Sequence, residues 1–417
     1  MAEVTFPQLI QRACGIDVHL KVVVATIDGA GIQRETRSFK TFTSSLNELK
    51  EWLLSNGVTH VGMESTGVYW KPVYKVLEDS IPNVWIVNAR HIKNVPGHKT
   101  DKMDSEWICK LLLAGLLKPS YIPPKEQRQL RDLTRYRNKL IQQIASEKNR
   151  MMRILEDCNI KLSSVVSNTS GATATSLIDM LCEGKVLTLD DINSVYHGKL
   201  SASPEELLEA CTGFVEEHHI YLLQMIRKDI DQTQTLVDDL SERIKRLLSK
   251  YENVLELLRE IPGFSTKVVE DLVSEIGLDM SHFPSEKHLS SWAGLSPGNN
   301  ESAGKKKRTN THGNKQVKAV ITEAAWAATR TKNTFFSERY HRIAARRGKK
   351  RALIAVGHSQ LISVYLILST GSRYHELGAQ YMQSKIEQKR KVYLSSELKK
   401  LGYNVSLTKV PQAVTPN

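Results

Sequence analysis

Two acidic residues stand within apolar runs near the N-terminus, and they constrain the fold more than any other feature of the sequence. Asp17 lies inside the run over residues 14–27, which has the β-branched composition of a buried strand, and Glu64 ends the apolar part of a second run, residues 60–64. An ionised carboxylate in a buried strand is unfavourable unless it is paired or binds a metal. Both strands are therefore expected to bring their acids to a place where such a partner is available.

A second pair of acids, Asp101 and Asp104, stands where a helical pattern begins that continues through Ile108, Leu111 and Leu112. The three-residue spacing projects both carboxylates from one face of the first helical turn. Acids in a first turn also complement the helix dipole or cap backbone amides, so a purely structural role stays open. Four acids brought together would repel one another, and a hard divalent cation with oxygen ligands is the usual remedy.

The N-terminal region, residues 12–122, alternates strand and helix signals and predicts an α/β domain. The expected elements are a hairpin of residues 14–27 and 31–41, a helix from about 45 to 54, a strand ending at Glu64, a helix near 69–78, a strand over 83–87 and the helix after Asp101. This order predicts an RNase H-like fold, a mixed sheet flanked by helices with its acids gathered at one end. Such a site would hold two metal ions and activate an oxygen nucleophile for in-line attack on a phosphodiester.

A long helical arm is expected after the break at Ile122-Pro-Pro-Lys125. Mostly apolar residues recur at alternating spacings of three and four over residues 130–154 and again over 226–261, which is the pattern of coiled-coil helices. The arm is assigned to residues 125–260, with a small inserted subdomain at about 162–214 whose role the sequence does not indicate. The two long helices pair either within one chain or with another copy, and the spacing does not decide between these.

The C-terminal part is expected to be a mainly α-helical domain over residues 255–375, followed by a tail over 376–417. Residues 260–267, with Pro262 and Gly263, separate two expected helices. This is either a helix-hairpin-helix whose amides meet a phosphate or a plain helix connection. Residues 292–308 then form an apolar anchor and a polar, glycine-containing loop that ends in four cations.

Positive charge is concentrated between Lys305 and Arg351. This segment holds fifteen Lys or Arg against two acids, an excess of thirteen that equals the net charge of the whole chain. Such concentration favours contact with a phosphate backbone, although a solvated basic segment has a similar composition. The candidate nucleic-acid-binding residues are Lys305, Lys306, Lys307, Arg308, Arg346, Arg347, Lys349 and Lys350.

The composition also bears on the compartment of the protein. No apolar run approaches the roughly 20 residues that span a bilayer, and no basic segment followed by an apolar one stands at the N-terminus, so we expect a cytoplasmic protein without a membrane partner. The five cysteines are scattered without any Cys-x-x-Cys pair, which argues against a disulfide framework and a zinc site.

Five motifs occur in a fixed order along the chain. They are Gly15-Ile-Asp-Val-His19, Met63-Glu-Ser-Thr-Gly67, Asn88-Ala-Arg-His91 with Lys99-Thr-Asp-Lys-Met-Asp104, Ile261-Pro-Gly263, and Ala293-Gly-Leu-Ser-Pro-Gly-Asn-Asn-Glu-Ser-Ala-Gly304. Together they resemble the DEDD transposases of bacterial insertion sequences, the group that includes the Piv-type DNA invertases and the bridge-RNA-guided recombinases. The resemblance covers roughly residues 12–157 and 225–370.

The resemblance implies specific roles for five residues. The metal ligands would be Asp17, Glu64, Asp101 and Asp104 of the RuvC-like domain, binding Mg²⁺ or alternatively Mn²⁺. In the C-terminal transposase domain, Ser302 would be the nucleophile that attacks DNA.

The same resemblance implies the partners. These are double-stranded donor and target DNA, a non-coding bridge RNA, and further copies of the chain in a homodimer or homotetramer. The chain departs from the family pattern where Leu20 precedes Lys21, and where the insertion at 162–214 exceeds the arm of compact members.

Two alternatives remain from the sequence. A structure-specific endonuclease of the Holliday-junction type would use the same acids with water as the nucleophile. A non-catalytic nucleic-acid-binding protein would use the acids structurally and bind through the basic segment alone.

Overall fold

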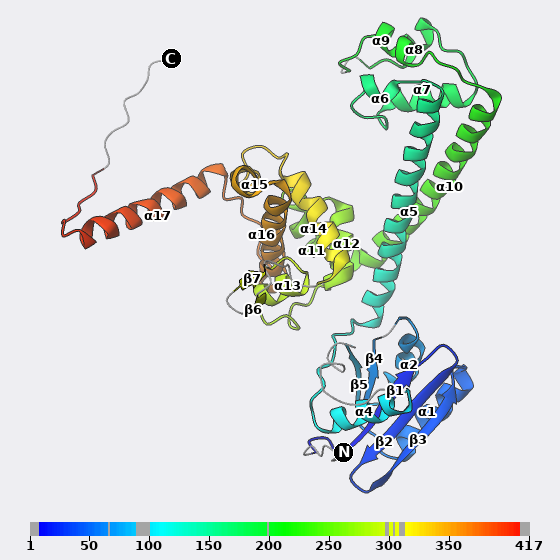
Figure 1. Ribbon diagram of the computed structural model, residues 1–417, viewed down its shortest axis with the longest axis vertical. Coiled ribbons are helices and arrows are strands. Elements are labelled where there is room, and N and C mark those ends of the chain that lie inside the picture. The colour runs from blue at the N-terminus through cyan, green and yellow to red at the C-terminus, as the bar shows by residue number, and fades with distance from the viewer. Residues whose placement is uncertain are drawn as a thin grey trace. The chain divides into compact units, whose positions relative to one another are not determined.

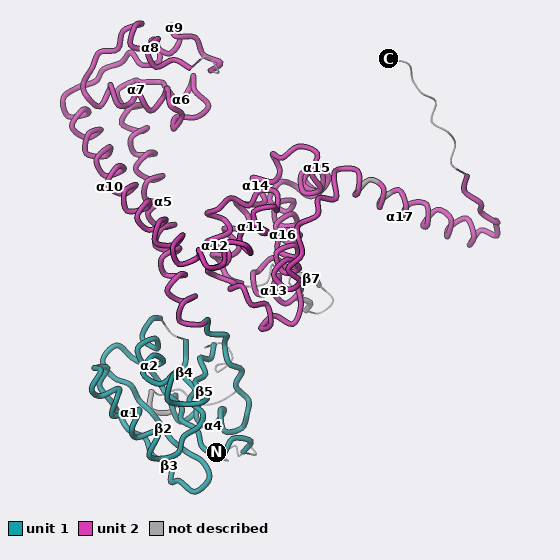
Figure 2. Tube along the Cα trace, turned by 180° about the vertical axis from the view of Figure 1, so that it is seen from behind, with its two compact units in different colours: residues 1–123 teal, residues 124–417 magenta. Residues whose placement is uncertain are grey.

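The computed structural model describes residues 8–65, 67–88, 101–197, 200–296, 300–302, 305–307 and 313–408, with the backbone alone at 101–103, 300–302, 305–307, 382–383 and 386. The chain forms two compact units, residues 1–123 and 124–417 (Figure 2).

A five-stranded mixed sheet forms the centre of the N-terminal unit (Figure 1). Its strands are β1 (Arg12–Val18), β2 (Val22–Gly29), β3 (Ile32–Lys40), β4 (His60–Glu64) and β5 (Asn83–Val87). They lie in the order β3-β2-β1-β4-β5, and β1 pairs antiparallel with β2 but parallel with β4. The predicted mixed sheet with flanking helices is thereby confirmed.

The prediction of one strand over residues 14–27 is wrong. The chain reverses between β1 and β2, where the His19 N–H donates to the Val22 carbonyl at 2.9 Å and Leu20 is 62% exposed. Both strands are buried on both faces over most of their length. Strands of this kind appear as continuous apolar runs, so the hydrophobic pattern does not show where the chain turns.

Helices cover the two faces of this sheet. They are α1 (Thr43–Ser55), α2 (Trp70–Leu77) and α4 (Asp101–Leu113). Ile16 of β1 belongs to the apolar cluster that includes Leu49 and Leu53 of α1, whereas Ala13 belongs to the cluster of Leu112 and the rest of α4. Because neighbouring strand residues point to opposite faces, alternate residues of β1 meet different helices.

Two long helices, α5 (Lys125–Asp157) and α10 (Glu217–Leu248), begin the second unit and pack along one another (Figure 1). Their buried residues include Leu140, Ile144 and Met151 of α5, and Ile230 and Val237 of α10. The apolar three-and-four spacing of both helices therefore marks the sides that are buried within one chain.

Four short helices connect α5 to α10. They are α6 (Leu162–Val165), α7 (Ala172–Cys182), α8 (Leu189–Val195) and α9 (Pro204–Ala210). Ser203 caps α9 by accepting from the Glu206 N–H at 3.2 Å, because its hydroxyl satisfies an amide that the first helical turn leaves unpaired.

The apolar pattern over residues 226–261 does not belong to one continuous helix. The helix α10 ends at Leu248, and the 3₁₀ turn η1 (Ser249–Tyr251) and α11 (Glu252–Arg259) follow. The expectation of an unbroken helix fails because the same apolar spacing continues through the 3₁₀ turn.

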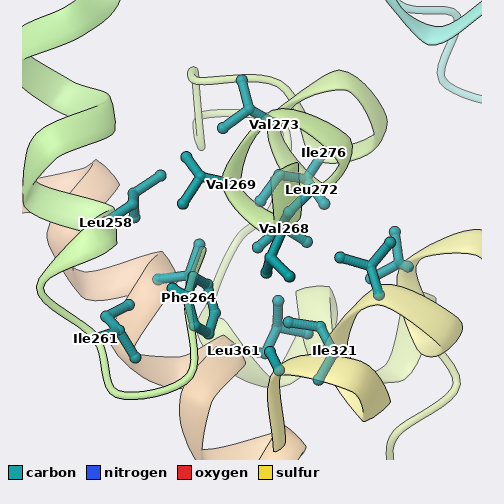
Figure 3. Packing of buried hydrophobic residues seen from close by; sticks show 14 of the residues in the cluster. Leu258, Ile261, Phe264, Val268, Val269, Leu272, Val273, Ile276, Ile321 and Leu361 are labelled. Carbon is teal, nitrogen blue, oxygen red and sulfur yellow. The ribbon is translucent and has the colours of Figure 1, made fainter. Parts of the chain in front are cut away.

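The remaining elements surround a second apolar core. They are α12 (Thr266–Ile276), α13 (Glu286–Trp292), β6 (Asn300–Ser302), β7 (Lys305–Lys307), α14 (Lys315–Ala328), α15 (Phe335–Arg347), α16 (Lys349–Thr370) and α17 (Ala379–Lys400). Figure 3 shows Leu258, Phe264 and Leu272 packed near Ile321 and Leu361, so residues from α11, α12, α14 and α16 share this core.

The helix α16 has the length and composition of a membrane span. The expectation that no apolar run approaches that length is therefore wrong, because residues 352–370 contain no charged side chain. Val356, Leu361 and Val364 are nevertheless buried in the core of the second unit. These three residues pack as the residues of a core helix do.

Candidate active site

Asp17 and Glu64 end neighbouring strands at the same end of the sheet. Ile16 of β1 pairs with Met63 of the parallel strand β4, so the two acids are the next residues along their strands. Adjacent residues in this register lie side by side, and their side chains point to the same face of the sheet.

Two glycines identify that face. A Cβ on Gly15 would lie 2.1 Å from the Ser105 carbonyl oxygen, and a Cβ on Gly62 would lie 3.2 Å from side-chain atoms of Ile108 and Leu112. Both glycines therefore face α4. Asp17 and Glu64 stand two residues further along β1 and β4, and the two-residue period of a strand directs them to this same face.

The first turn of α4 lies toward the end of the sheet that carries the acids. The last residue of the helix, Leu113, accepts from the Leu9 N–H just before β1, whereas the hydroxyl of Ser105 bonds to that of Thr26 further along the sheet. The helix thus runs antiparallel to β1. Its first residues, Asp101 to Asp104, approach the end of the strand where Asp17 lies.

Asp17, Glu64 and Asp104 share this end of the sheet without forming a closed cluster. The Oδ2 atom of Asp17 lies 2.8 Å from Nε2 of His19, and the side chain of Asp17 is only 16% exposed. Among the side chains that the structure describes, Asp17, Glu64 and Asp104 do not bring their oxygens within 4.8 Å of one another as a group of three. Like charges disfavour a closer approach unless a cation lies between them.

The chemistry of the donors fits a hard divalent cation. The side chains of Asp17, Glu64 and Asp104 offer only carboxylate oxygens, the ligands that Mg²⁺ and Mn²⁺ prefer. These residues would hold the ion at the end of β1 and β4. The side chain of Asp101, the fourth predicted ligand, lies outside the described part of the structure.

A different cluster, Glu216, His218 and His219, brings three possible metal ligands within 4.8 Å. It lies at the start of α10, and Nδ1 of His219 accepts from the Glu216 N–H at 3.2 Å. This bond belongs to the N-terminal cap of the helix. The cluster therefore has a structural explanation, and it stands apart from the predicted acids in the sequence.

Ser302 lies in a short β-hairpin instead of the flexible loop that the composition suggested. Its backbone pairs with Lys305, and Asn300 pairs with Lys307 across the two antiparallel strands β6 and β7. Strands of three residues are too short to show an alternating pattern in the sequence. Arg308 lies outside the described residues.

The two ends of the segment that carries Ser302 are held together. The Asn314 N–H donates to the Trp292 carbonyl at 3.0 Å. Gly313 lies against Gly294 so closely that a Cβ on Gly313 would be 2.1 Å from the Gly294 nitrogen. These contacts fix the base of the hairpin to the end of α13 and the start of α14.

A buried carboxylate connects this base to α5. Glu275 of α12 accepts from Asn314 Nδ2 at 2.8 Å and from the Arg135 guanidinium at 2.6 and 3.0 Å, and its side chain is 2% exposed. A charge so deeply buried needs partners of this kind. Glu275 carries no local signal in the sequence, because its partners are distant in the chain.

The turn over residues 260–267 is packed as an internal connection. Gly263, at φ +89°, lies so near α14 that a Cβ would be 2.2 Å from the Ala324 carbonyl oxygen. Gln360 donates to the Pro262 carbonyl at 2.9 Å. These contacts favour a plain helix connection over a phosphate-binding hairpin.

Four of the predicted nucleic-acid-binding residues surround the junction of α15 and α16. Arg346 and Arg347 end α15, Lys349 and Lys350 begin α16, and Gly348 between them has φ +83°. All four cations are exposed, and within the described part of the chain none makes an ion pair. Their charges are therefore available to an external anion.

The class of the protein follows from two matches to models of protein families. A DEDD transposase domain matches residues 14–160, and a transposase model of the IS116/IS110/IS902 family matches residues 255–341. Together they cover more than half of the chain. The protein is thus a transposase, an enzyme that cleaves and recombines DNA.

More specifically, the chain belongs to the IS110 family of DEDD transposases, which confirms the resemblance found in the sequence. A comparison with curated proteins found no match. Membership implies that the protein binds DNA and depends on a divalent metal. The first match includes all four acids and the second includes Ser302, whereas residues 161–254 lie outside both.

Proposed function

We propose that this transposase cleaves and exchanges DNA strands with Ser302 as the nucleophile, and that Asp17, Glu64, Asp101 and Asp104 bind the divalent cation, Mg²⁺ or Mn²⁺. The observation that carries the proposal is the arrangement of these acids. Asp17 and Glu64 end neighbouring parallel strands on the face covered by α4, and the first turn of α4 holds the other two.

A bound divalent ion would stabilise negative charge on the phosphate and favour the deprotonated form of an oxygen nucleophile. A serine hydroxyl is a weak nucleophile at neutral pH and needs such assistance. The proposal therefore requires Ser302 and the four acids to meet during the reaction, in one chain or in different copies.

The chemistry is a pair of transesterifications. The Ser302 oxygen attacks phosphorus, a phosphoserine ester forms, and the bond to the leaving sugar oxygen breaks. The serine proton passes to solvent, and the leaving sugar oxygen takes up a proton from solvent. The sugar hydroxyl of a second strand then attacks the same phosphorus. This step releases Ser302 and joins the exchanged strands.

His19 has a supporting role in this scheme. Its Nε2 atom lies 2.8 Å from the Asp17 carboxylate. The side chain of His19 is 44% exposed, whereas that of Asp17 is 16% exposed. A hydrogen bond from His19 holds the Asp17 carboxylate in one orientation. It thereby limits the reorganisation that metal binding requires.

The remaining parts of the proposal rest on the family. The N-terminal unit is the RNase H-like catalytic domain, and α5 and α10, with α6 to α9 between them, form a coiled-coil arm for assembly into a homodimer or homotetramer. The cations from Lys305 to Lys350 contact double-stranded donor and target DNA. A non-coding bridge RNA guides the choice of target in a cytoplasmic reaction.

A Holliday-junction-type endonuclease is the alternative, since it would use the same acids with water. The test uses duplex DNA with a nick near the cleavage site, so that a covalent intermediate accumulates. With Mg²⁺ present, the wild-type protein should yield a protein–DNA adduct that survives denaturation, and Ser302→Ala should not, although it should still bind DNA. Cleavage by Ser302→Ala at the wild-type rate would favour the endonuclease.

A further inference from the structure

Two arginines on α15 and one histidine on α16 form a cluster of hydrogen-bond donors outside the predicted set. The Arg339 Nε–H donates to the Ala355 carbonyl of α16 at 3.4 Å, and its guanidinium carbon lies 5.9 Å from the centre of the Phe335 ring. These contacts hold the guanidinium where α15 packs against α16. It is therefore more restricted than an arginine that extends into solvent.

Arg342 extends the cluster by one turn. Residues three apart on a helix share a face, so Arg342 follows Arg339 along the same side of α15. Its Nε atom is buried and has no hydrogen-bond partner in the described part of the structure. The terminal nitrogens of its guanidinium are not among the buried unpaired atoms, and Arg342 as a whole is partly exposed, so an acceptor from outside the chain would reach the group through them.

His358 completes the cluster from α16. It follows Ala355, the acceptor of the Arg339 hydrogen bond, by three residues and is partly buried. Burial lowers the pKa of His358, and the charge of Arg339 lowers it further. Burial also lowers the pKa of Arg339, and the charge of Arg342 lowers it further. The charged neighbours that act on these groups are cations.

We propose that Arg339, Arg342 and His358 form a phosphate-binding notch that receives one backbone phosphate of the DNA. The assignment uses the DNA binding included in the proposed function but does not depend on Ser302 or on the metal. Guanidinium groups match the geometry of phosphate oxygens and bind them through paired hydrogen bonds. A phosphate would bind the terminal nitrogens of the two guanidinium groups and reduce the repulsion between the two arginines.

The notch differs from the exposed cations at the α15–α16 junction. Arg346 and Lys350 are exposed and must be ordered when they bind, whereas Arg339 is already held by its contacts to Ala355 and Phe335. A side chain that is ordered beforehand loses less conformational entropy on binding. The notch should therefore fix the position of the DNA, in addition to attracting it.

The competing explanation is structural. The aliphatic parts of Arg339 and Arg342 would cover apolar surface between the helices, and their charged groups would only reach water. In that case the arginines would contribute to stability and not to affinity for DNA. The two explanations are separated by a binding measurement with a charge-matched control.

The experiment measures binding of the full-length protein to a fluorescent DNA duplex in EDTA, where cleavage does not interfere. Arg339→Gln and Arg342→Gln should each weaken binding about tenfold at moderate salt and reduce the slope of log affinity against log salt by about one. The control is Arg373→Gln, which removes one charge from a side chain that is 80% exposed and pairs with Glu260. It should change the affinity less than about twofold.

A second arm remains informative if a variant is unstable. A single uncharged methylphosphonate replaces one phosphate at a time along the duplex, and at one position it should weaken binding of the wild-type protein. The same replacement should not weaken binding of Arg342→Lys any further, because this variant keeps the charge but has already lost the paired hydrogen bonds. Affinities of both Gln variants equal to that of Arg373→Gln would overturn the proposal. The proposal would also be overturned if the Gln variants bound single-stranded RNA more weakly than the wild-type protein but bound duplex DNA equally well, because the notch would then be assigned to RNA.

Discussion

The hydroxyl groups of Thr26 and Ser105 lie 2.8 Å apart and form a buried hydrogen bond between the sheet and α4. Thr26 also bonds to Thr36 of β3 at 2.8 Å, so the contact continues across the sheet. Ser105 directly follows Asp104. The bond therefore fixes the helical turn that carries two of the proposed metal ligands against β2, the strand that pairs with β1, which carries Asp17.

The close approach of α4 to Gly15 gives the first prediction. In Gly15→Ala the new methyl group would lie 2.1 Å from the Ser105 carbonyl oxygen and 2.4 Å from the Cys109 nitrogen. Both are backbone atoms, so the helix itself must move. We expect a loss of about 1–3 kcal/mol in the free energy of unfolding and impaired DNA cleavage. Ser105→Ala, which adds no atoms, should cost about 1 kcal/mol. Equal stability of Gly15→Ala and wild type in urea unfolding would contradict this packing.

Neutralising the strand acids should separate catalysis from stability. Asp17→Asn and Glu64→Gln should each reduce Mg²⁺-dependent cleavage by a factor of at least about 100, since several kcal/mol of charge stabilisation are lost. The melting temperature should stay the same or rise, because repulsion between carboxylates decreases. The control is Asp28→Asn, because Asp28 lies on β2 at the opposite end of the sheet, where its carboxylate pairs with Arg34. If the variants lose stability but keep their activity, the acids are structural.

The lysines of β7 should contribute to DNA affinity through charge. Replacing Lys305, Lys306 and Lys307 together by Gln should reduce the slope of log affinity against log salt by up to about three, because fewer counterions are released. The control is Lys228→Gln on α10, outside the basic segment. Binding is measured by fluorescence anisotropy over a series of salt concentrations. An unchanged slope would show that these lysines do not face the DNA.

The buried carboxylate of Glu275 should be essential for the stability of the second unit. Glu275→Ala leaves Arg135 and Asn314 without their shared acceptor, and we expect a loss of about 3–5 kcal/mol. Asp231→Ala, which removes an exposed partner of Arg227 on α10, should have little effect. Denaturant unfolding of both variants tests the difference. Similar losses of unfolding free energy in the two variants would show that the buried contacts of Glu275 contribute no more than an exposed ion pair.

Local patterns in the sequence were sufficient for much of the N-terminal unit. The strand at Asn83–Val87 and the start of α4 at Asp101 agree with the structure, because apolar spacing and acids in a first turn are local signals. The turn at His19 was missed because β1 and β2 are apolar on both faces. The hairpin at Ser302 was missed because its strands are short.

The contacts that position the candidate residues were not predictable in the same way. Thr26 and Ser105 are 79 residues apart, and Arg135 and Glu275 are 140 residues apart. Such pairs are determined by the folded topology and leave no periodic signal in one sequence. Arg339 and Arg342 belong to the basic segment and His358 follows it, but only the packing of α15 on α16 distinguishes these residues from the exposed cations.

The most direct test of the account is the identity of the residue that becomes linked to DNA. The wild-type protein is incubated with nicked duplex DNA and Mg²⁺, digested, and the peptide that carries a nucleotide is sequenced by mass spectrometry. We expect a phosphodiester on Ser302, absent from Ser302→Ala and from Asp104→Asn. Cleaved DNA without any covalent peptide, or a link to another residue, would contradict it.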